Sequence, residues 1–190
     1  MGRYHCPSNG DLKTGKKGER LTFSTQVIGV DTGSKKQNLV TSLGAKFIDF
    51  KSTTDLRAAI DKVTDNKGAD AVIVTAGSSA AFATAASLLR VEGVLCCIGI
   101  PPGGGKLLTP VSEIVIKGLQ IKGNLVGNLK ECMEAVELVR AGKVKPNVFV
   151  REFKELAEVY EELKRGDIAG RVVLRVGDDP GPVLRAGSRL

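Results

Sequence analysis

The sequence has few aromatic residues: there is no tryptophan, and aromatic residues make up 4% of its 190 residues. Proteins that bind single-stranded nucleic acid stack the bases on aromatic side chains, so this composition disfavours a nucleic-acid partner. The formal net charge of +7 does not reverse that conclusion, because lysine and arginine are interspersed with acidic residues after the first twenty positions. We therefore expect the basic residues to form solvated surface.

The sequence also lacks a long hydrophobic run. No segment approaches the roughly 18 consecutive apolar residues of a membrane-spanning helix, and the N-terminus lacks the apolar stretch of a secretory signal. A hydrophobic content of 42% and a charged content of 26% are typical of a globular chain with room for one domain or little more. We expect a soluble, cytoplasmic protein with no membrane partner.

Histidine and cysteine are too few and too widely separated for a zinc site. The single histidine, His5, adjoins Cys6, while Cys96 and Cys97 are neighbours in an apolar segment and Cys132 stands alone. Structural zinc sites need closely spaced Cys/His ligands, and disulfide frameworks need cysteines on separate elements. The cysteines are interpreted as small buried hydrophobic residues in a reducing compartment, and no metal ligand is expected.

From residue 26 onward, short β-branched apolar segments alternate with segments of helical periodicity. This alternation predicts an α/β protein with a parallel sheet of the doubly wound, Rossmann type. The expected strands are 27–30, 47–50, 71–74, 94–98, 119–123 and 172–176. The expected helices lie within 39–43, 56–63, 82–89, 111–117, 129–140 and 153–163. Residues 1–25 follow neither period and are expected to be mostly basic coil, and 177–190 to be a flexible tail.

Asp31 ends the first expected strand. In doubly wound sheets, a carboxylate at this place binds the two hydroxyls of an adenosine ribose and repels a 2′-phosphate. Aspartate before Thr-Gly-Ser is equally typical of a helix N-cap or a turn former, so the residue alone leaves both interpretations open. The glycine-rich turn G-x-G-x-x-G, which a dinucleotide site also needs, does not occur in the sequence.

Several sequence blocks resemble the cofactor-binding half and C-terminal end of the zinc-dependent medium-chain alcohol dehydrogenases, especially the fungal ethanol-type enzymes. In order, the blocks are VIGVDTGSKKQNLVTSLGAKFIDF, GADAVIVTAGSSAAF, LRVEGVLCCIGIPPG, VIKGLQIKGNLVGN and ELAEVYEELKRGDIAGRVVL. The resemblance implies an oxidoreductase that transfers hydride between a primary alcohol and NAD, with zinc as the expected metal of the family.

The resemblance also implies roles for individual residues. Asp31 would bind the adenosine ribose and select NAD, Lys36 would lie beside the same ribose, and Arg171 would reach the pyrophosphate. Three short segments would line the adenine and nicotinamide parts of the groove. These segments are Thr75-Ala76-Gly77, Gly99-Ile100-Pro101 and Asn124-Leu125-Val126. Without the resemblance, Lys36 would be interpreted as helix surface, Gly99 and Pro101 as turn formers, and Arg171 as a charge at a strand edge.

Parts of the family pattern have no counterpart in the sequence. The first cofactor strand, its glycine-rich turn and the next helix should precede Val27, and the catalytic domain with the zinc ligands should come earlier. We therefore expect 26–150 to be a Rossmann-like domain with a gap between the strands that end at Asp31 and Val74. Residues 151–176 would be a helix and strand that return to the absent catalytic domain. Weak or lost NAD binding, no bound zinc and no activity of this chain alone would follow.

Two alternatives remain open. In this family, the region equivalent to 119–128 builds a dimer contact, so the chain could be a non-catalytic dimerisation module that forms a homo-oligomer or associates with a full-length relative. A methyltransferase that uses S-adenosylmethionine also holds a ribose on an acidic residue after its second strand. That alternative leaves the C-terminal blocks unexplained.

Overall fold

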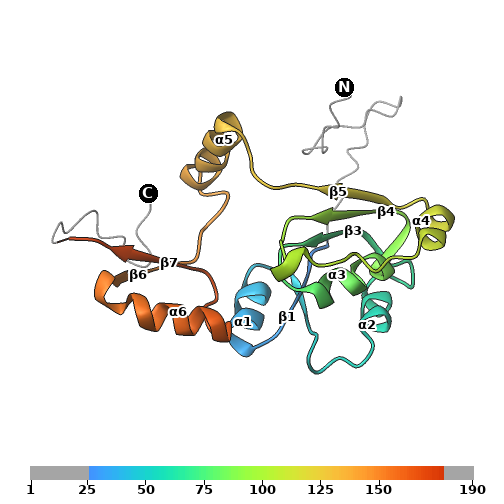
Figure 1. Cartoon of the computed structure of the whole chain (residues 1–190), viewed down its shortest axis with the longest axis horizontal. Helices are drawn as coiled ribbons and strands as arrows, with labels where there is room; N and C mark the ends of the chain where they lie inside the picture. The colour runs from blue at the N-terminus through green and yellow to red at the C-terminus, as the bar shows by residue number, and fades with distance from the viewer. Residues whose placement is uncertain (1–25, 178–190) are drawn as a thin grey trace, which may run out of the picture.

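The structure, a computed structural model, describes residues 26–177. Strands and helices alternate along these residues, and every strand pair is parallel (Figure 1). The strands are β1 (Ile28–Asp31), β2 (Lys46–Asp49), β3 (Ala69–Val74), β4 (Leu89–Cys97), β5 (Gln120–Gly123), β6 (Val148–Glu152) and β7 (Arg171–Arg175). The helices are α1 (Ser34–Ser42), α2 (Leu56–Val63), α3 (Ser79–Ala85), α4 (Val111–Lys117), α5 (Leu129–Arg140) and α6 (Leu156–Arg165). The predicted α/β class is confirmed, and within 26–177 no helix is long and apolar enough to cross a membrane.

The expected gap in the sheet is present in the described part of the chain. β1 pairs with β2, and β3, β4 and β5 form a separate three-stranded sheet, so no ladder joins β1 to β3. Val30 in β1 and Ile73 in β3 are exposed, the latter to 64%. Because unpaired strand edges offer free N–H and C=O groups, the β1 edge of one sheet and the β3 edge of the other are both open to a further strand within the described residues.

The main hydrophobic core lies between the β3–β4–β5 sheet and the helices α3 and α4. Leu89 and Leu95 of β4 are fully buried there, and Phe82 and Ala85 of α3 pack in the same cluster. The prediction that helix continues to Leu89 is wrong. A 3₁₀ turn, Ala86–Leu88, ends the helix, and the buried Leu89 begins β4.

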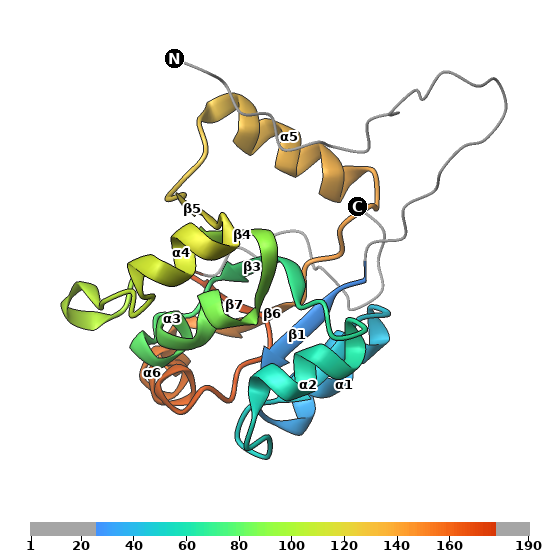
Figure 2. The same cartoon turned by 90° about the vertical axis from the view of Figure 1, so that its right-hand side faces the viewer.

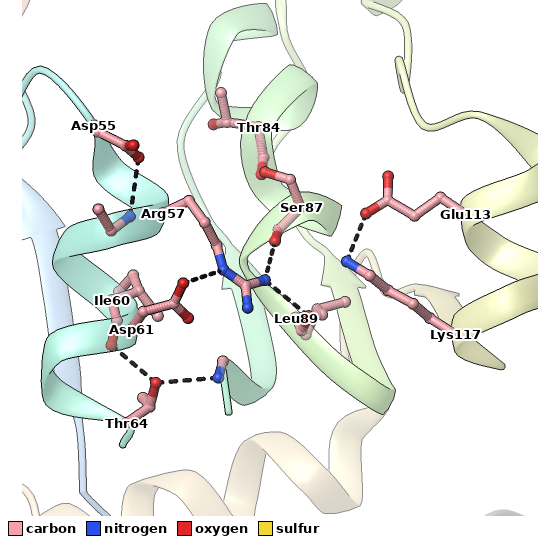
Figure 3. A network of polar contacts seen from close by, with 12 residues as sticks. Asp55, Arg57, Ile60, Asp61, Thr64, Thr84, Ser87, Leu89, Glu113 and Lys117 are labelled. Carbon is pink, nitrogen blue, oxygen red and sulfur yellow. Dashed lines mark hydrogen bonds and ion pairs between the residues drawn. The ribbon is translucent and has the colours of Figure 1, made fainter. Parts of the chain in front are cut away.

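Arg57 of α2 connects that helix to the start of β4 (Figure 3). Its Nε donates to Asp61 Oδ2 at 2.8 Å, and its Nη1 donates to the carbonyl oxygens of Ser87 and Leu89. The helix itself begins at a cap, because Asp55 Oδ1 accepts a hydrogen bond of 2.9 Å from the Ala58 N–H. The Arg57 side chain thus fixes α2 against the turn that leads into β4.

The C-terminal residues form a strand–helix–strand unit of their own, which lies at the left of Figure 1. β6 and β7 pair in parallel, a 3₁₀ turn (Phe153–Glu155) follows β6, and α6 connects the two strands. Arg151 of β6 binds both carboxylate oxygens of Glu162 in α6, at 3.0 and 3.1 Å, and this pairing raises the pKa of Arg151. The sequence analysis did not predict β6, which runs across the expected domain boundary after residue 150.

Helix α5 has the predicted bounds, but the predicted burial of its Cys132 is wrong. Figures 1 and 2 both show it standing away from the sheets. None of its residues is buried, Met133 is 62% exposed, and Cys132 is exposed rather than buried. The helix is held locally instead, by a capping box in which Asn128 and Glu131 exchange hydrogen bonds. Its apolar face therefore has no partner among the described residues.

Candidate functional site

The carboxyl end of β1 carries an ion pair between two of the predicted site residues. Lys36 Nζ donates to Asp31 Oδ1 at 2.8 Å, and the Thr32 N–H donates to the same oxygen at 2.8 Å. The N-cap of α1 is Gly33, and no side chain caps the helix. Asp31 is therefore not the N-cap of α1: its carboxylate binds the turn that follows β1, as the turn-forming interpretation predicts, and it also binds Lys36. Its ribose role stays a prediction.

A second carboxylate at this edge escaped the sequence analysis. Asp49, at the end of β2, is the register partner of Asp31. Its Oδ2 accepts from Thr32 Oγ1 at 3.1 Å and from the Gly33 N–H at 3.4 Å, and its Oδ1 accepts from the Lys51 N–H at 2.9 Å. These hydrogen bonds, led by the one from Lys51, lower the pKa of Asp49. Its position at the end of the second strand, equivalent to that of Asp31 in the first, was the signal that could have identified it.

A hollow of about 200 Å³ lies beside the ion pair. The hollow is lined on one side by the first turn of α1, including Lys35 and Lys36, and on the other by Gly166 and Asp167, which follow α6. The C-terminal unit therefore contributes to the surroundings of the Asp31–Lys36 pair, although it is remote in sequence.

The three predicted groove segments converge at the carboxyl ends of β3, β4 and β5. The N–H of Gly99 donates to the Val74 carbonyl at 2.9 Å, and the N–H of Asn124 donates to the Cys97 carbonyl at 2.9 Å. A Cβ at Gly99 would lie 2.2 Å from the Ala76 carbonyl oxygen, which is too close for any other residue. The turns after β3 and β4 thus touch through a position that requires glycine, as expected of a ligand-binding edge in a doubly wound sheet.

The side chains of these segments differ in burial. Pro101 is buried, whereas Ile100, Leu125 and Val126 are largely exposed. Arg171 stands at the start of β7, where its N–H donates to the Asn147 carbonyl at 2.9 Å. Its backbone pairs with β6, and its pyrophosphate role stays a prediction.

The described residues offer no cluster of side chains that could bind a metal ion. Cys97 is partly buried, and its removal from water raises the pKa of its thiol, which disfavours the thiolate that a metal would need. His5 and Cys6 lie outside the described residues. A larger hollow runs along α5 beside Leu129, Met133 and Leu138, and no predicted cofactor residue lines it.

Comparison with known proteins identifies the family. A model of the zinc-binding dehydrogenases matches residues 22–141. Alcohol dehydrogenase 1 of Emericella nidulans is 36% identical over 153 residues, which cover 80% of this chain and 43% of that protein. An alcohol dehydrogenase of Schizosaccharomyces pombe is 37% identical over 153 residues, which again cover 80% of this chain and 43% of that protein. The chain therefore spans less than half the length of these relatives.

Solved structures agree with the sequence matches. The alcohol dehydrogenase of Aeropyrum pernix superimposes with a TM-score of 0.74 at 30% identity, over 80% of this chain and 43% of that one. Benzyl alcohol dehydrogenase of Acinetobacter calcoaceticus gives a TM-score of 0.70 at 24% identity over the same shares, which supports the fold. The chain belongs to the zinc-binding dehydrogenase family, and its fold is that of the Rossmann-type cofactor domain of alcohol dehydrogenases.

Proposed function

We propose that this chain is the cofactor-binding part of an alcohol dehydrogenase and that its ligand is NAD. The observation that carries the proposal is the Asp31–Lys36 pair at the carboxyl end of β1. Within 26–177, both hydrogen bonds that this carboxylate accepts end on Oδ1, so the second oxygen remains available to ribose hydroxyls. The family relationship supports the same assignment.

The charge of Asp31 gives the expected preference for NAD over NADP. A 2′-phosphate held about 4 Å from a carboxylate would be repelled by roughly 4 kcal/mol per unit charge at an effective dielectric constant near 20. The ion pair with Lys36 offsets part of this repulsion, and Asp31 is 46% exposed, so solvent reduces it further. We expect a clear preference for NAD rather than complete exclusion of NADP.

Two elements of the family's chemistry do not fit the described residues. The glycine-rich turn that would hold the pyrophosphate at a helix N-terminus is absent from the sequence, so the proposed NAD affinity of this chain is weak. Bound zinc acts as a Lewis acid toward an alcohol oxygen, but 26–177 provide no ligand set for it. We therefore derive no catalytic step from this chain.

Titration of the purified chain with NAD and NADP tests the cofactor assignment. The wild type should bind NAD more tightly, and Asp31→Asn should narrow the ratio of the two affinities about tenfold, which is 1.4 kcal/mol. Asp70→Asn is the matched control, because Asp70 also pairs with a basic residue at the surface but belongs to β3. Unchanged affinities in Asp31→Asn would remove Asp31 from the cofactor site.

We also propose that this chain by itself neither binds zinc nor oxidises alcohols. Purified chain should contain no stoichiometric zinc and should not oxidise ethanol in the presence of NAD, because hydride transfer in the family depends on the zinc ligands. Elemental analysis that gives one zinc per chain, or turnover above background, would contradict this part. A cytoplasmic location belongs to the same proposal and is supported by the free thiols of Cys96, Cys97 and Cys132.

A role in association is the second candidate function. All four residues of β5 are exposed, and Leu125 and Val126 directly after it are exposed to 69% and 78%. Apolar side chains beside an outer strand are typical of a contact surface, which supports a homo-oligomer or association with a full-length relative through 119–128. Sedimentation of the wild type and of a Leu125→Lys/Val126→Lys variant tests this, since the variant should be monomeric.

The family match leaves the methyltransferase alternative without support.

A further inference from the structure

The two aspartates that end β1 and β2 are register partners with different contacts. Asp31 holds Lys36, whereas Asp49 reaches across to the turn that follows β1. We propose that Asp49 is a positioning residue for the cofactor: it fixes the Thr32–Gly33 turn and thereby orients Asp31 and Lys36 toward the adenosine ribose. This inference rests on the proposed function.

The first step is the attachment of the turn to β2. Asp49 Oδ2 accepts from both Thr32 Oγ1 and the Gly33 N–H, at 3.1 and 3.4 Å. Gly33 has a φ of +100°, a conformation that residues with a Cβ rarely adopt. Because no side chain caps α1, Asp49 supplies the carboxylate that stabilises the entry to this helix from another strand.

The second step connects the turn to the ion pair. Thr32 donates its N–H to Asp31 Oδ1, and the Gly33 carbonyl accepts from the Gln37 N–H at 3.0 Å to begin α1. Lys36 lies in the first turn of that helix and reaches back to Asp31 at 2.8 Å. A shift of Thr32 and Gly33 would therefore move both members of the pair, and such small displacements weaken a preorganised binding site.

The third step concerns rigidity. The Oδ1 of Asp49 accepts from the Lys51 N–H, and its backbone carbonyl accepts from Thr53 Oγ1 at 2.7 Å. Asp49 is thus fixed in its own loop before it contacts the turn after β1. A carboxylate fixed in this way can hold the Thr32–Gly33 turn in one position. A freely rotating surface side chain would lose conformational entropy with each contact it made, so its contacts would stabilise the turn less.

The test compares the binding of AMP and 2′-deoxy-AMP to the purified chain by calorimetric titration. These probes differ in one ribose hydroxyl, so their affinity ratio reports the orientation of Asp31 specifically. The wild type should prefer AMP about tenfold, as expected for the loss of one hydrogen bond to a charged group. Asp49→Ala should reduce that preference to about threefold or less, and Thr32→Val, which keeps the Asp49 charge and its bond to Lys51, should reduce it in part.

Asp55→Ala is the matched control. Asp55 also accepts from a backbone N–H, but it caps α2, and no hydrogen bond within 26–177 joins its side chain to the turn after β1. A loss that is merely structural would lower the melting temperatures of Asp49→Ala and Asp55→Ala alike and would weaken both probes equally, which leaves the ratio unchanged. If Asp49→Ala does not fold, the ratio in Thr32→Val decides the question.

The outcomes separate this inference from the proposed function. If Asp31→Asn abolishes the preference for AMP while Asp49→Ala and Thr32→Val retain it, the positioning role of Asp49 is wrong and the NAD assignment stands. If the wild type shows no preference, or Asp31→Asn retains it, the ribose role of Asp31 is wrong and the inference about Asp49 falls with it.

Discussion

The β3–β4–β5 sheet and helix α5 show how differently two regions of one chain can be stabilised. Both regions have the apolar patterns that their sequences predict. In the sheet, Leu89 and Leu95 of β4 are completely buried beneath α3 and α4. In α5, Met133 and Val136 are mostly exposed, because no element of the described chain covers them. An apolar pattern thus contributes to stability only where the tertiary structure provides a surface for it.

Truncation of one apolar side chain in each region should give the largest difference in stability between the β3–β4–β5 sheet and α5. Leu95→Ala should lower the free energy of unfolding by about 2–5 kcal/mol, because it leaves a cavity in the core. Met133→Ala should change it by less than about 0.5 kcal/mol, because the side chain already contacts water. Urea unfolding of both variants measures the difference, and equal losses would show that α5 packs on the chain in solution.

The open edges of β1 and β3 predict a second effect. A strand–glycine-turn–helix segment from a related dehydrogenase, co-expressed with this chain, should pair with both edges and supply an anion-binding helix N-terminus. At a concentration about 100 times its dissociation constant, the segment would stabilise the chain by about 2.7 kcal/mol. Thermal unfolding should become more cooperative, and NAD affinity should rise.

A matched segment with proline in the centre of its strand is the control, since proline removes a ladder hydrogen bond. It should give neither effect. A chain that already unfolds cooperatively as a monomer, and does not respond to either segment, would mean that the two sheets are closed by a different strand order in solution. The transfer of the cofactor groove from the family would then be wrong.

The smallest expected effect concerns acid stability at the β1–β2 edge. The folded protein lowers the pKa of Asp49 from its ordinary value of 3.8. The stability that this carboxylate contributes is therefore fully present above about pH 4 and is lost as the pH falls through the lowered pKa. Melting temperatures between pH 2 and pH 6 should decline less steeply in Asp49→Asn than in the wild type. Thr32→Val should keep most of the decline, because the largest contribution comes from the Lys51 N–H.

Several features could be predicted from the sequence because they depend on local patterns. The bounds of α2, α4 and α5 agree with the helical periodicity, and the gap between β1 and β3 was expected from the family resemblance, which the comparisons confirm. Strand β6 was missed because its segment follows Pro146 and includes Arg151, whose guanidinium is paired with Glu162 eleven residues later. Leu89 was assigned to a helix because its apolar character fits either structure.

The sequence by itself determined the α/β class, the alternation of elements and Asp31 as a candidate ribose ligand, because periodicity and strand-end position are visible along the chain. Only the tertiary structure excluded Asp31 as the N-cap of α1, since the cap at Gly33 and the contact of Asp31 with Lys36 depend on how β1 and α1 are arranged. It also revealed the contact of Asp49 with Thr32, because a hydrogen bond between residues 17 positions apart depends on strand pairing. The exposure of α5 was decided in the same way, because burial requires a neighbour and not merely an apolar face.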